Sequence, residues 1–423
     1  MNDRMFEGAR MTTLTRRRFL LAAGAAAVAT TGAGVGWAEL ADRTRTDPLP
    51  PGAGVLVVVT LYGGNDGLGT VVPAGDPAYQ DARPDLAYAP NEVLDLGEGL
   101  GLNPGMTGLK AQWDSGTLAV VRGVGYPKPD HSHFRSMDIW QTASPERPSS
   151  TGWIGRWLDG AGRDPLLAVS LEPVLPPLLA GATTAGAALP LRGLTFPGGP
   201  LGTAFAAMGA PSAGEPELQA YAARAVTDLH RTADTLGPAL TESGDPPADT
   251  APVAGSDTAP DTDGGVLAAQ LGVVARCVER AAPTRVYSVS LGGFDTHADE
   301  RGTQQRLLTE VDAAVSGFLT RMAGGDRGRN VVVLVYSEFG RRVAANANEG
   351  TDHGTAGPVL VAGPRVHGGF VGAQPSLTDL DAGDLTFTVD FRDVYATLLH
   401  GVLGADPEPV LGPGRTTLPL LAT

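Results

Sequence analysis

The feature that most constrains the fold is a set of short, uninterrupted apolar runs spaced along the chain. They occupy residues 55–60, 118–121, 286–291, 331–336 and 359–362. Because these runs do not alternate apolar with polar residues, they are typical of strands buried on both faces, as in a parallel sheet. Residues 215–232, 265–281 and 303–323 have apolar residues at helical spacing. Alternating strands and helices predict an α/β fold with right-handed crossovers.

Charge and cysteine content exclude several classes of protein. The chain has 31 Lys and Arg against 46 Asp and Glu, a net charge of −15, so we expect no non-specific nucleic-acid binding. Its single cysteine, Cys277, allows neither an internal disulfide nor a cysteine-based metal site. We expect Cys277 to be a small buried side chain in a helix.

The N-terminus predicts export. Arg16, Arg17 and Arg18 precede an apolar, Ala/Gly-rich run at 21–35, and small residues follow at 36–38. This pattern is typical of a twin-arginine signal peptide over residues 1–38, with an N-terminal membrane anchor as the alternative. We expect a secreted, periplasmic or cell-wall protein with no membrane span once the signal is cleaved. Because twin-arginine export carries folded proteins, often already loaded with a cofactor, it favours a metal.

The remaining chain is expected to form one domain. Residues 39–53 are interpreted as a linker and residues 54–423 as a single α/β domain. Within it, residues at about 237–264 are rich in Pro, Asp, Thr, Gly and Ala, and we expect a disordered insertion there.

Histidines and carboxylates cluster where the predicted strands end. The candidates are Asp66, His131, His133, Asp295, His297, Glu338, Asp352 and His353. Ligands in open α/β sheets bind beyond the carboxyl ends of the strands. Histidine and carboxylate without cysteine suit zinc, manganese or another divalent ion. These residues therefore predict a metal site at one edge of the sheet.

Each motif also has a simpler interpretation. The glycines around Asp66 could form an ordinary turn with an Asx hydrogen bond, and Asp295 could cap a helix beside a surface histidine. His131 and His133 could be solvated in a polar loop. Glu338 could pair with Arg341 or Arg342 as a surface salt bridge.

Six segments together resemble domain-of-unknown-function family 1501, over about residues 55–403. They read LYGGNDGLGTVVP, GVGYPKPDHSHFRSMDIWQTA, TGWIGRWLDG, SLGGFDTHADE, VLVYSEFGRRVAANANEGTDHGTAGPVLVAGP and DFRDVYATLLH. That family is grouped with the alkaline phosphatase/sulfatase-like superfamily. The resemblance implies a three-layer α/β sandwich with a central, mostly parallel sheet, alkaline phosphatase-like in type. It also implies one or two divalent metals and a hydroxyl or formylglycine nucleophile that attacks phosphorus or sulfur.

The resemblance also assigns roles to individual residues. Asp66, Asp295, His297, Glu338 and His353 resemble the superfamily's metal ligands. Ser132 lies where a nucleophile is expected, with Ser136 as its competitor. Arg135, Arg341 or Arg342 could neutralise the oxygens of the substrate. These assignments are what the resemblance implies, and spacing alone does not establish them.

Two departures from the superfamily pattern matter. Glu338-Phe339 stands where the superfamily has Asp-His, and phenylalanine cannot bind a metal. One of two metal sites is therefore expected to be missing, or rebuilt with His131, His133 or Asp352. In addition, Cys277 is not in a sulfatase-type nucleophile motif, which disfavours a formylglycine enzyme.

The resulting expectation is an exported, metal-dependent hydrolase of phosphate or sulfate esters. It would use one or two ions of zinc, manganese or calcium and act on a small anionic ester. A hydrolase of another ester or anhydride would use the same site. The alternative from a different class is a non-catalytic exported protein that keeps the fold to bind or assemble with an exported protein partner.

Overall fold

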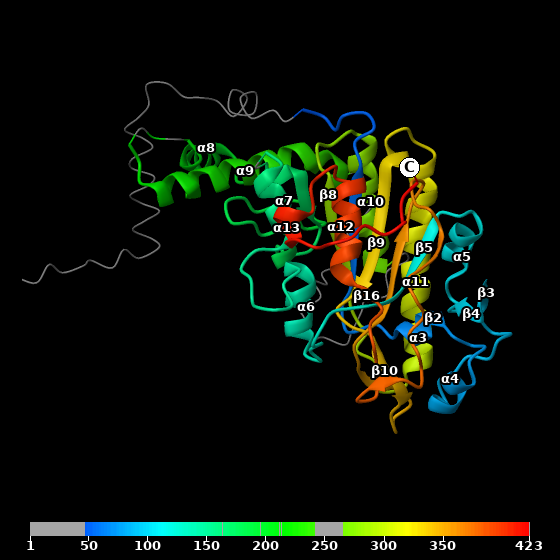
Figure 1. Ribbon diagram of the computed structural model, residues 1–423. Coiled ribbons are helices and arrows are strands. Elements are labelled where there is room, and N and C mark those ends of the chain that lie inside the picture. Colours follow the sequence, from blue (N-terminus) through cyan, green and yellow to red (C-terminus); the bar gives the residue numbers. More distant parts are fainter. Residues whose placement is uncertain are drawn as a thin grey trace, which may run out of the picture. The chain divides into compact units, whose positions relative to one another are not determined.

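The computed structural model describes residues 47–162, 164–194, 196–210, 212, 214–241 and 265–422 (Figure 1). The predicted signal at 1–38, the first part of the linker, and residues 242–264 of the predicted insertion lie outside the described residues. The chain divides into two compact units. One comprises Asp47–Gly193 with Thr235–Thr423, and the other comprises Met1–Thr46 with Leu194–Asp234.

A nine-stranded sheet forms the centre of the larger unit. Its strand order is β13-β5-β12-β9-β1-β8-β6-β7, with β16 also paired to β5. The strands are β1 (Val55–Leu61), β5 (Leu118–Gly125), β6 (Ala168–Ser170), β7 (Ala187–Ala188), β8 (Val286–Leu291), β9 (Val331–Ser337), β12 (Gly357–Ala362), β13 (Gly369–Val371) and β16 (Val389–Asp390). All pairings are parallel except those of β12 with β5 and β9. The predicted mostly parallel sheet is confirmed, and each of the five apolar runs forms one of its strands.

Helices cover both faces of this sheet, because alternate residues of β1 enter different cores. Val55, Val57 and Val59 pack with α5 (Thr107–Asp114), α10 (Gly265–Glu279) and α11 (Glu300–Ala323). Leu56 and Val58 pack with α6 (His133–Thr142), α7 (Trp153–Gly160) and α12 (Phe391–Gly401). The architecture is therefore helix–sheet–helix, as expected for an α/β sandwich. Cys277 lies buried in α10, where burial raises the pKa of its thiol to about 11.

Smaller elements complete the larger unit around this sandwich. A three-stranded sheet and two short helices follow β1, namely α3 (Gly67–Thr70), β2 (Val71–Val72), α4 (Pro77–Ala82), β3 (Leu94–Gly97) and β4 (Leu100–Leu102). Two hairpins pair β10 (Arg341–Ala345) with β11 (Thr351–His353), and β14 (Leu380–Asp381) with β15 (Asp384–Leu385). The helix α13 (Glu408–Leu411) packs on α7.

The other unit contains α8 (Gly199–Met208) and the start of α9 (Glu217–Thr241). Within it, the ring of Phe196 stacks on His230, with 4.4 Å between ring centroids. His230 also pairs with Asp234 one turn along α9. In the described part of the chain, the helices are all too short or too polar to span a bilayer.

A buried charge cluster joins the segment after β1 to the loop before β3. Asp66 caps α3 and forms a two-pronged ion pair with Arg83, at 2.5 and 2.9 Å. Arg83 also donates to the backbone carbonyls of Arg342 and Val343. Glu300, at the start of α11, is buried nearby, and its Oε2 accepts a hydrogen bond from Thr351. Burial, reinforced by the negative charge of Asp66, raises the pKa of Glu300 from 4.5 to about 8.

This pKa predicts a pH-dependent stability. Between pH 4.5 and 8 the folded chain keeps a proton on Glu300 that the unfolded chain releases, so the free energy of unfolding falls as pH rises. Glu300→Gln, which cannot ionise, should remove up to about 4 kcal/mol of this decline. Urea unfolding at pH 5, 6.5 and 8 measures it, with Glu98→Gln at an exposed position as control. The prediction would be contradicted if the free energy of unfolding of Glu300→Gln fell with pH as steeply as that of the wild type.

Candidate metal centre

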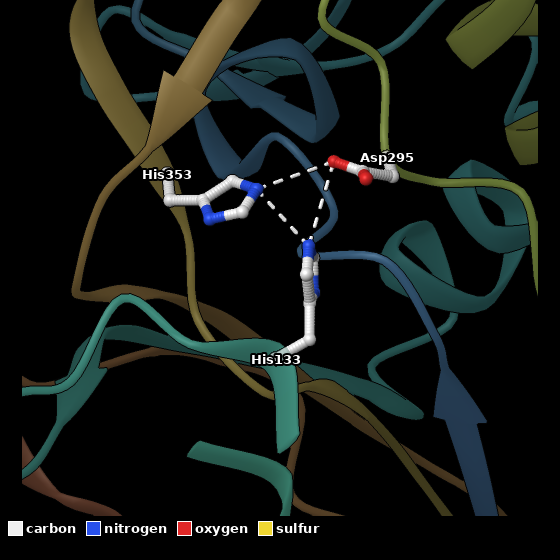
Figure 2. A group of neighbouring side chains, drawn as sticks. All are labelled: His133, Asp295 and His353. Atoms are coloured by element: carbon white, nitrogen blue, oxygen red, sulfur yellow. Dashed lines mark hydrogen bonds and ion pairs between the residues drawn. The ribbon is translucent and has the colours of Figure 1, made fainter. Parts of the chain in front are cut away.

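Predicted site residues from four segments of the chain lie at the carboxyl edge of the sheet. His133 opens α6 after β5, Asp295 and His297 follow β8, Glu338 follows β9, and His353 ends β11. These segments are far apart in sequence, yet parallel strands deliver their ends to one edge of the sheet. Figure 2 shows the side chains of His133, Asp295 and His353 pointing toward one another.

Two imidazole nitrogens, of His133 and His353, converge with a carboxylate oxygen of Asp295, and the Nε2 atom of His297 lies beside the latter two. The Nε2 atom of His353 lies 3.0 Å from the Nε2 atoms of both His133 and His297. Asp295 Oδ1 lies 3.0 Å from His297 Nε2, 3.3 Å from His353 Nε2 and 3.5 Å from His133 Nε2. Ligands of a tetrahedral ion with bonds of about 2.0–2.1 Å stand about 3.3 Å apart. The spacing therefore fits a group that could hold a metal ion.

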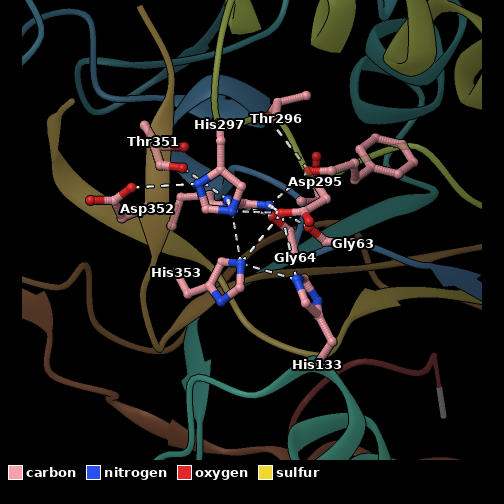
Figure 3. Close-up of polar contacts among 12 residues, drawn as sticks. Gly63, Gly64, His133, Asp295, Thr296, His297, Thr351, Asp352 and His353 are labelled. Carbon is pink, nitrogen blue, oxygen red and sulfur yellow. Dashed lines mark hydrogen bonds and ion pairs between the residues drawn. The ribbon is translucent and has the colours of Figure 1, made fainter. Parts of the chain in front are cut away.

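The other nitrogen of each histidine lies near an oxygen, and Figure 3 shows this contact for His297 and Asp352. His133 Nδ1 lies 2.8 Å from Glu338 Oε1, and His297 Nδ1 lies 3.4 Å from Asp352 Oδ1. His353 Nδ1 lies 2.7 Å from the backbone carbonyl of His131. A carbonyl oxygen only accepts, so His353 Nδ1 carries the proton and its Nε2 offers a lone pair when the ring is neutral. Oxygen partners on Nδ1 are the outer contacts typical of metal-binding histidines.

Ionisation at the centre follows from the same contacts. The hydrogen bond to Glu338 raises the pKa of His133, against the effect of burial. Burial lowers the pKa of His353, which favours its neutral, ligand-competent form. Burial alone would raise the pKa of Asp295, but the hydrogen bond and charge of Arg341 outweigh it and the pKa is lowered. The centre thus favours an ionised Asp295 beside a neutral His353.

Arg341 connects the loops around the centre through hydrogen bonds. Its fully buried guanidinium donates to the carbonyls of Gly63, Gly64, Phe294 and Thr351, and to Asp295 Oδ1 at 2.7 Å. All its donors therefore have protein acceptors, and they are not directed at a substrate as the resemblance had allowed. Arg342 is more accessible, with its Nε 3.6 Å from Asp384 Oδ1.

Two glycines allow the loop after β1 to approach the loop after β8 and the Phe339 ring closely. Gly63 and Gly64 have φ of +117° and +67°. A Cβ on Gly63 would lie 2.5 Å from the backbone nitrogen of Asp295, and one on Gly64 would lie 2.1 Å from the Phe339 ring. The Phe339 ring packs against those of His133 and His353. It supports the two rings from one side.

The remaining predicted residues have different environments. Asp66 is paired with Arg83 and lies outside the convergent group. Ser132 is exposed at the N-cap of α6, directly before His133, and its side chain makes no capping hydrogen bond. Ser136 is fully buried, bonded to Tyr126 and to the backbone carbonyl of Glu338, so its hydroxyl is not accessible. Arg135 pairs with Asp138 on its own helix.

Sequence reasoning missed Asp384, which fixes the loop before α6. Its Oδ2 lies 2.8 Å from His131 Nε2, so His131 is held while its carbonyl contacts His353. Asp384 lies in a short hairpin without any apolar pattern, and no sequence signal points to it.

Comparisons with known proteins identify the family of the chain. Residues 207–416 match the family described as Protein of unknown function (DUF1501), and the chain belongs to that family. No curated protein matches its sequence. Among solved structures, it is similar to BT1596, a 2-O GAG sulfatase, at 12% identity and a TM-score of 0.27. The match covers 74% of this chain and 65% of the sulfatase chain.

Proposed function

We propose that this protein is an exported, metal-dependent hydrolase of phosphate or sulfate esters, with one ion held by His133, Asp295 and His353 and with His297 beside it. The observation that supports it is the convergence of two Nε2 atoms and a carboxylate oxygen, with an oxygen partner on the Nδ1 atom of each histidine. Such a set of nitrogen ligands favours zinc or manganese over calcium, which prefers oxygen. Export is proposed from the twin-arginine pattern alone.

The chain's own residues fit ester cleavage beside that ion. When bound, the ion would polarise the ester and activate a hydroxyl or water. Ser132 presents an exposed hydroxyl next to His133. It is also the N-cap residue of α6, whose first backbone N–H groups and helix dipole favour an anionic group. Arg342 is exposed enough to approach the substrate's oxygens, whereas the Arg341 guanidinium is already occupied.

Hydrolysis itself is the direct test. The zinc- or manganese-loaded protein should cleave p-nitrophenyl phosphate or p-nitrophenyl sulfate, and Ser132→Ala should lower kcat/KM by at least about 10²-fold because it removes the nucleophile. Ser149→Ala, at a serine bonded only within its own turn, serves as control. A loaded protein that cleaves neither ester would rule out this function and favour a binding or assembly role.

Glu338 should control metal affinity without being a ligand. Both its oxygens are engaged, Oε1 with His133 and the Gly63 N–H, and Oε2 with Ser337. Glu338→Ala should release the His133 ring and weaken zinc binding by about 10–100-fold. Competition against a chelator measures the dissociation constant, with Glu92→Ala on the exposed surface as control. Unchanged affinity in Glu338→Ala would show that His133 does not need this contact.

A further inference from the structure

Asp384 is a buried carboxylate in the short hairpin that pairs β14 with β15. Only 4% of its surface is exposed. Its Oδ2 atom lies 2.8 Å from Nε2 of His131, and its Oδ1 atom lies 3.6 Å from Nε of Arg342. Burying a carboxylate costs free energy unless a partner compensates for its charge. The two neighbours of Asp384 therefore indicate what this residue does.

The hairpin holds Asp384 in a position that does not depend on His131. The next residue, Leu385, is buried in the same small core as Val343 of β10, and β15 lies against that strand. The Leu385 carbonyl also accepts a hydrogen bond from Thr355 Oγ1 at 2.6 Å. The hairpin is thus anchored to β10 and to the segment after β11, and it presents Asp384 as a fixed support.

His131, in contrast, lies in an exposed loop. Residues 127–129 before it are exposed, and the backbone N–H of Asp130 donates to the hydroxyl of Tyr126, which begins the same loop. In the described part of the chain, the His131 ring has its polar contact with Asp384 and with no other side chain. This contact therefore holds the ring, and with it the backbone of the loop, against the hairpin.

The backbone carbonyl of His131 in turn contacts a proposed ligand. It lies 2.7 Å from Nδ1 of His353. Because a carbonyl oxygen only accepts, it keeps the proton of the neutral ring on Nδ1 and leaves the lone pair on Nε2, the atom that faces the centre. Without this carbonyl, His353 would be free to turn or to carry its proton on Nε2, and that atom could not then bind an ion.

We infer that Asp384 is a positioning residue of the metal centre, which acts through His131 on the tautomer and orientation of His353. The inference rests on the proposed function for the role of His353 as a ligand. Asp384 holds the His131 ring, and the carbonyl of that residue holds the Nδ1–H of His353. Loss of an outer contact of a metal-binding histidine typically weakens metal binding by about 10–100-fold. Here the controlling side chain lies one residue further out, in a different hairpin.

The first measurement needs no metal. In metal-free protein at about pH 8, where an ordinary imidazole is neutral, proton–nitrogen correlation NMR spectra distinguish a proton on Nδ1 from one on Nε2. The wild type should show His353 protonated on Nδ1, and Asp384→Ala should show a mixture of tautomers. Asp384→Asn, whose amide oxygen can accept from His131, should restore the wild-type state. Asp381→Ala, at the exposed position opposite Asp384 in the same hairpin, should leave it unchanged.

A double-mutant cycle on zinc affinity tests the path through His131. Asp384→Ala and His131→Ala should each weaken zinc binding by about 10-fold or more. The double variant should lose no more than either single variant, because both substitutions break the same link. Competition against a chelator measures the dissociation constants. Circular dichroism and thermal unfolding check that each variant is folded, and Asp384→Leu, which is similar in size, replaces Asp384→Ala if the latter is not.

The outcomes separate this inference from the proposed function. A His353 tautomer that is unchanged in Asp384→Ala, or losses of zinc affinity that multiply in the double variant, would overturn the inference. Zinc binding that depends on Asp384 without cleavage of the nitrophenyl esters would support the inference and reject the hydrolase. Ester cleavage with unchanged zinc affinity in Asp384→Ala would do the reverse. No zinc binding by the wild type would reject both.

Discussion

Replacing Asp295 and His353 together by alanine is expected to abolish retention of a divalent ion by the purified protein. The wild type should hold about one equivalent of zinc or manganese, because ligand atoms of His133, Asp295 and His353 converge at spacings that fit one tetrahedral ion. Removing two of these three ligands should cost more than the about 10–100-fold loss that follows from disturbing an outer contact. Elemental analysis after dialysis, with and without added metal, measures the difference.

The matched control is His400→Ala. His400 is exposed in the last turn of α12 and takes no part in the convergent group. It should retain metal at the wild-type level, which excludes a general effect of losing a histidine. If the wild type itself retained no metal after loading, or if the double variant retained as much, the metal centre would be rejected along with the function that depends on it.

Removal of the Arg83 guanidinium is expected to destabilise the protein by about 3–5 kcal/mol. In Arg83→Ala, Asp66 would stay buried without its ion-pair partner, and the backbone carbonyls of Arg342 and Val343 would lose their donors. Breaking a buried pair from one side costs far more than the pair contributes, because an uncompensated charge remains. Urea unfolding followed by circular dichroism measures the change.

Arg321→Ala provides the comparison, since its pair with Glu279 is exposed and should contribute at most about 1 kcal/mol. Asp66→Asn tests the role of the same cluster from its other side. It should lower stability yet leave the metal content unchanged, because Asp66 is bonded to Arg83 and not to the convergent group. Loss of metal in Asp66→Asn would instead support the ligand role implied by the family resemblance.

The sequence was most informative where burial is continuous. The runs at 55–60 and 331–336 lie at the centre of the sheet, so both of their faces are apolar. Such a continuous apolar run clearly predicts a buried strand. β6 and β7 were missed, because three and two residues are too short to form a pattern. The antiparallel direction of β12 was also not visible, since direction depends on the connection and not on the strand's own residues.

The site was predictable as a set of residues, but the role of each residue was not. Histidines and carboxylates after strands could be found because sheet topology brings strand ends together. Whether a carboxylate binds metal or orients a histidine depends on distances of a few ångströms, which spacing does not encode. Glu338 therefore looked like a ligand but contacts His133, while Asp66 has Arg83 as its partner.

The contacts of Arg341 have a consequence for the order of events during folding. Its acceptors belong to three loops, which follow β1, follow β8 and lie at β11, so its side chain can be satisfied only when all three are in place. Asp295 takes its position in the same step. No fragment of the chain contains the complete centre, and an ion would be selected by the finished fold rather than by the nascent chain. A chain that folds before it leaves the cytoplasm would therefore choose its ion from the cytoplasmic supply.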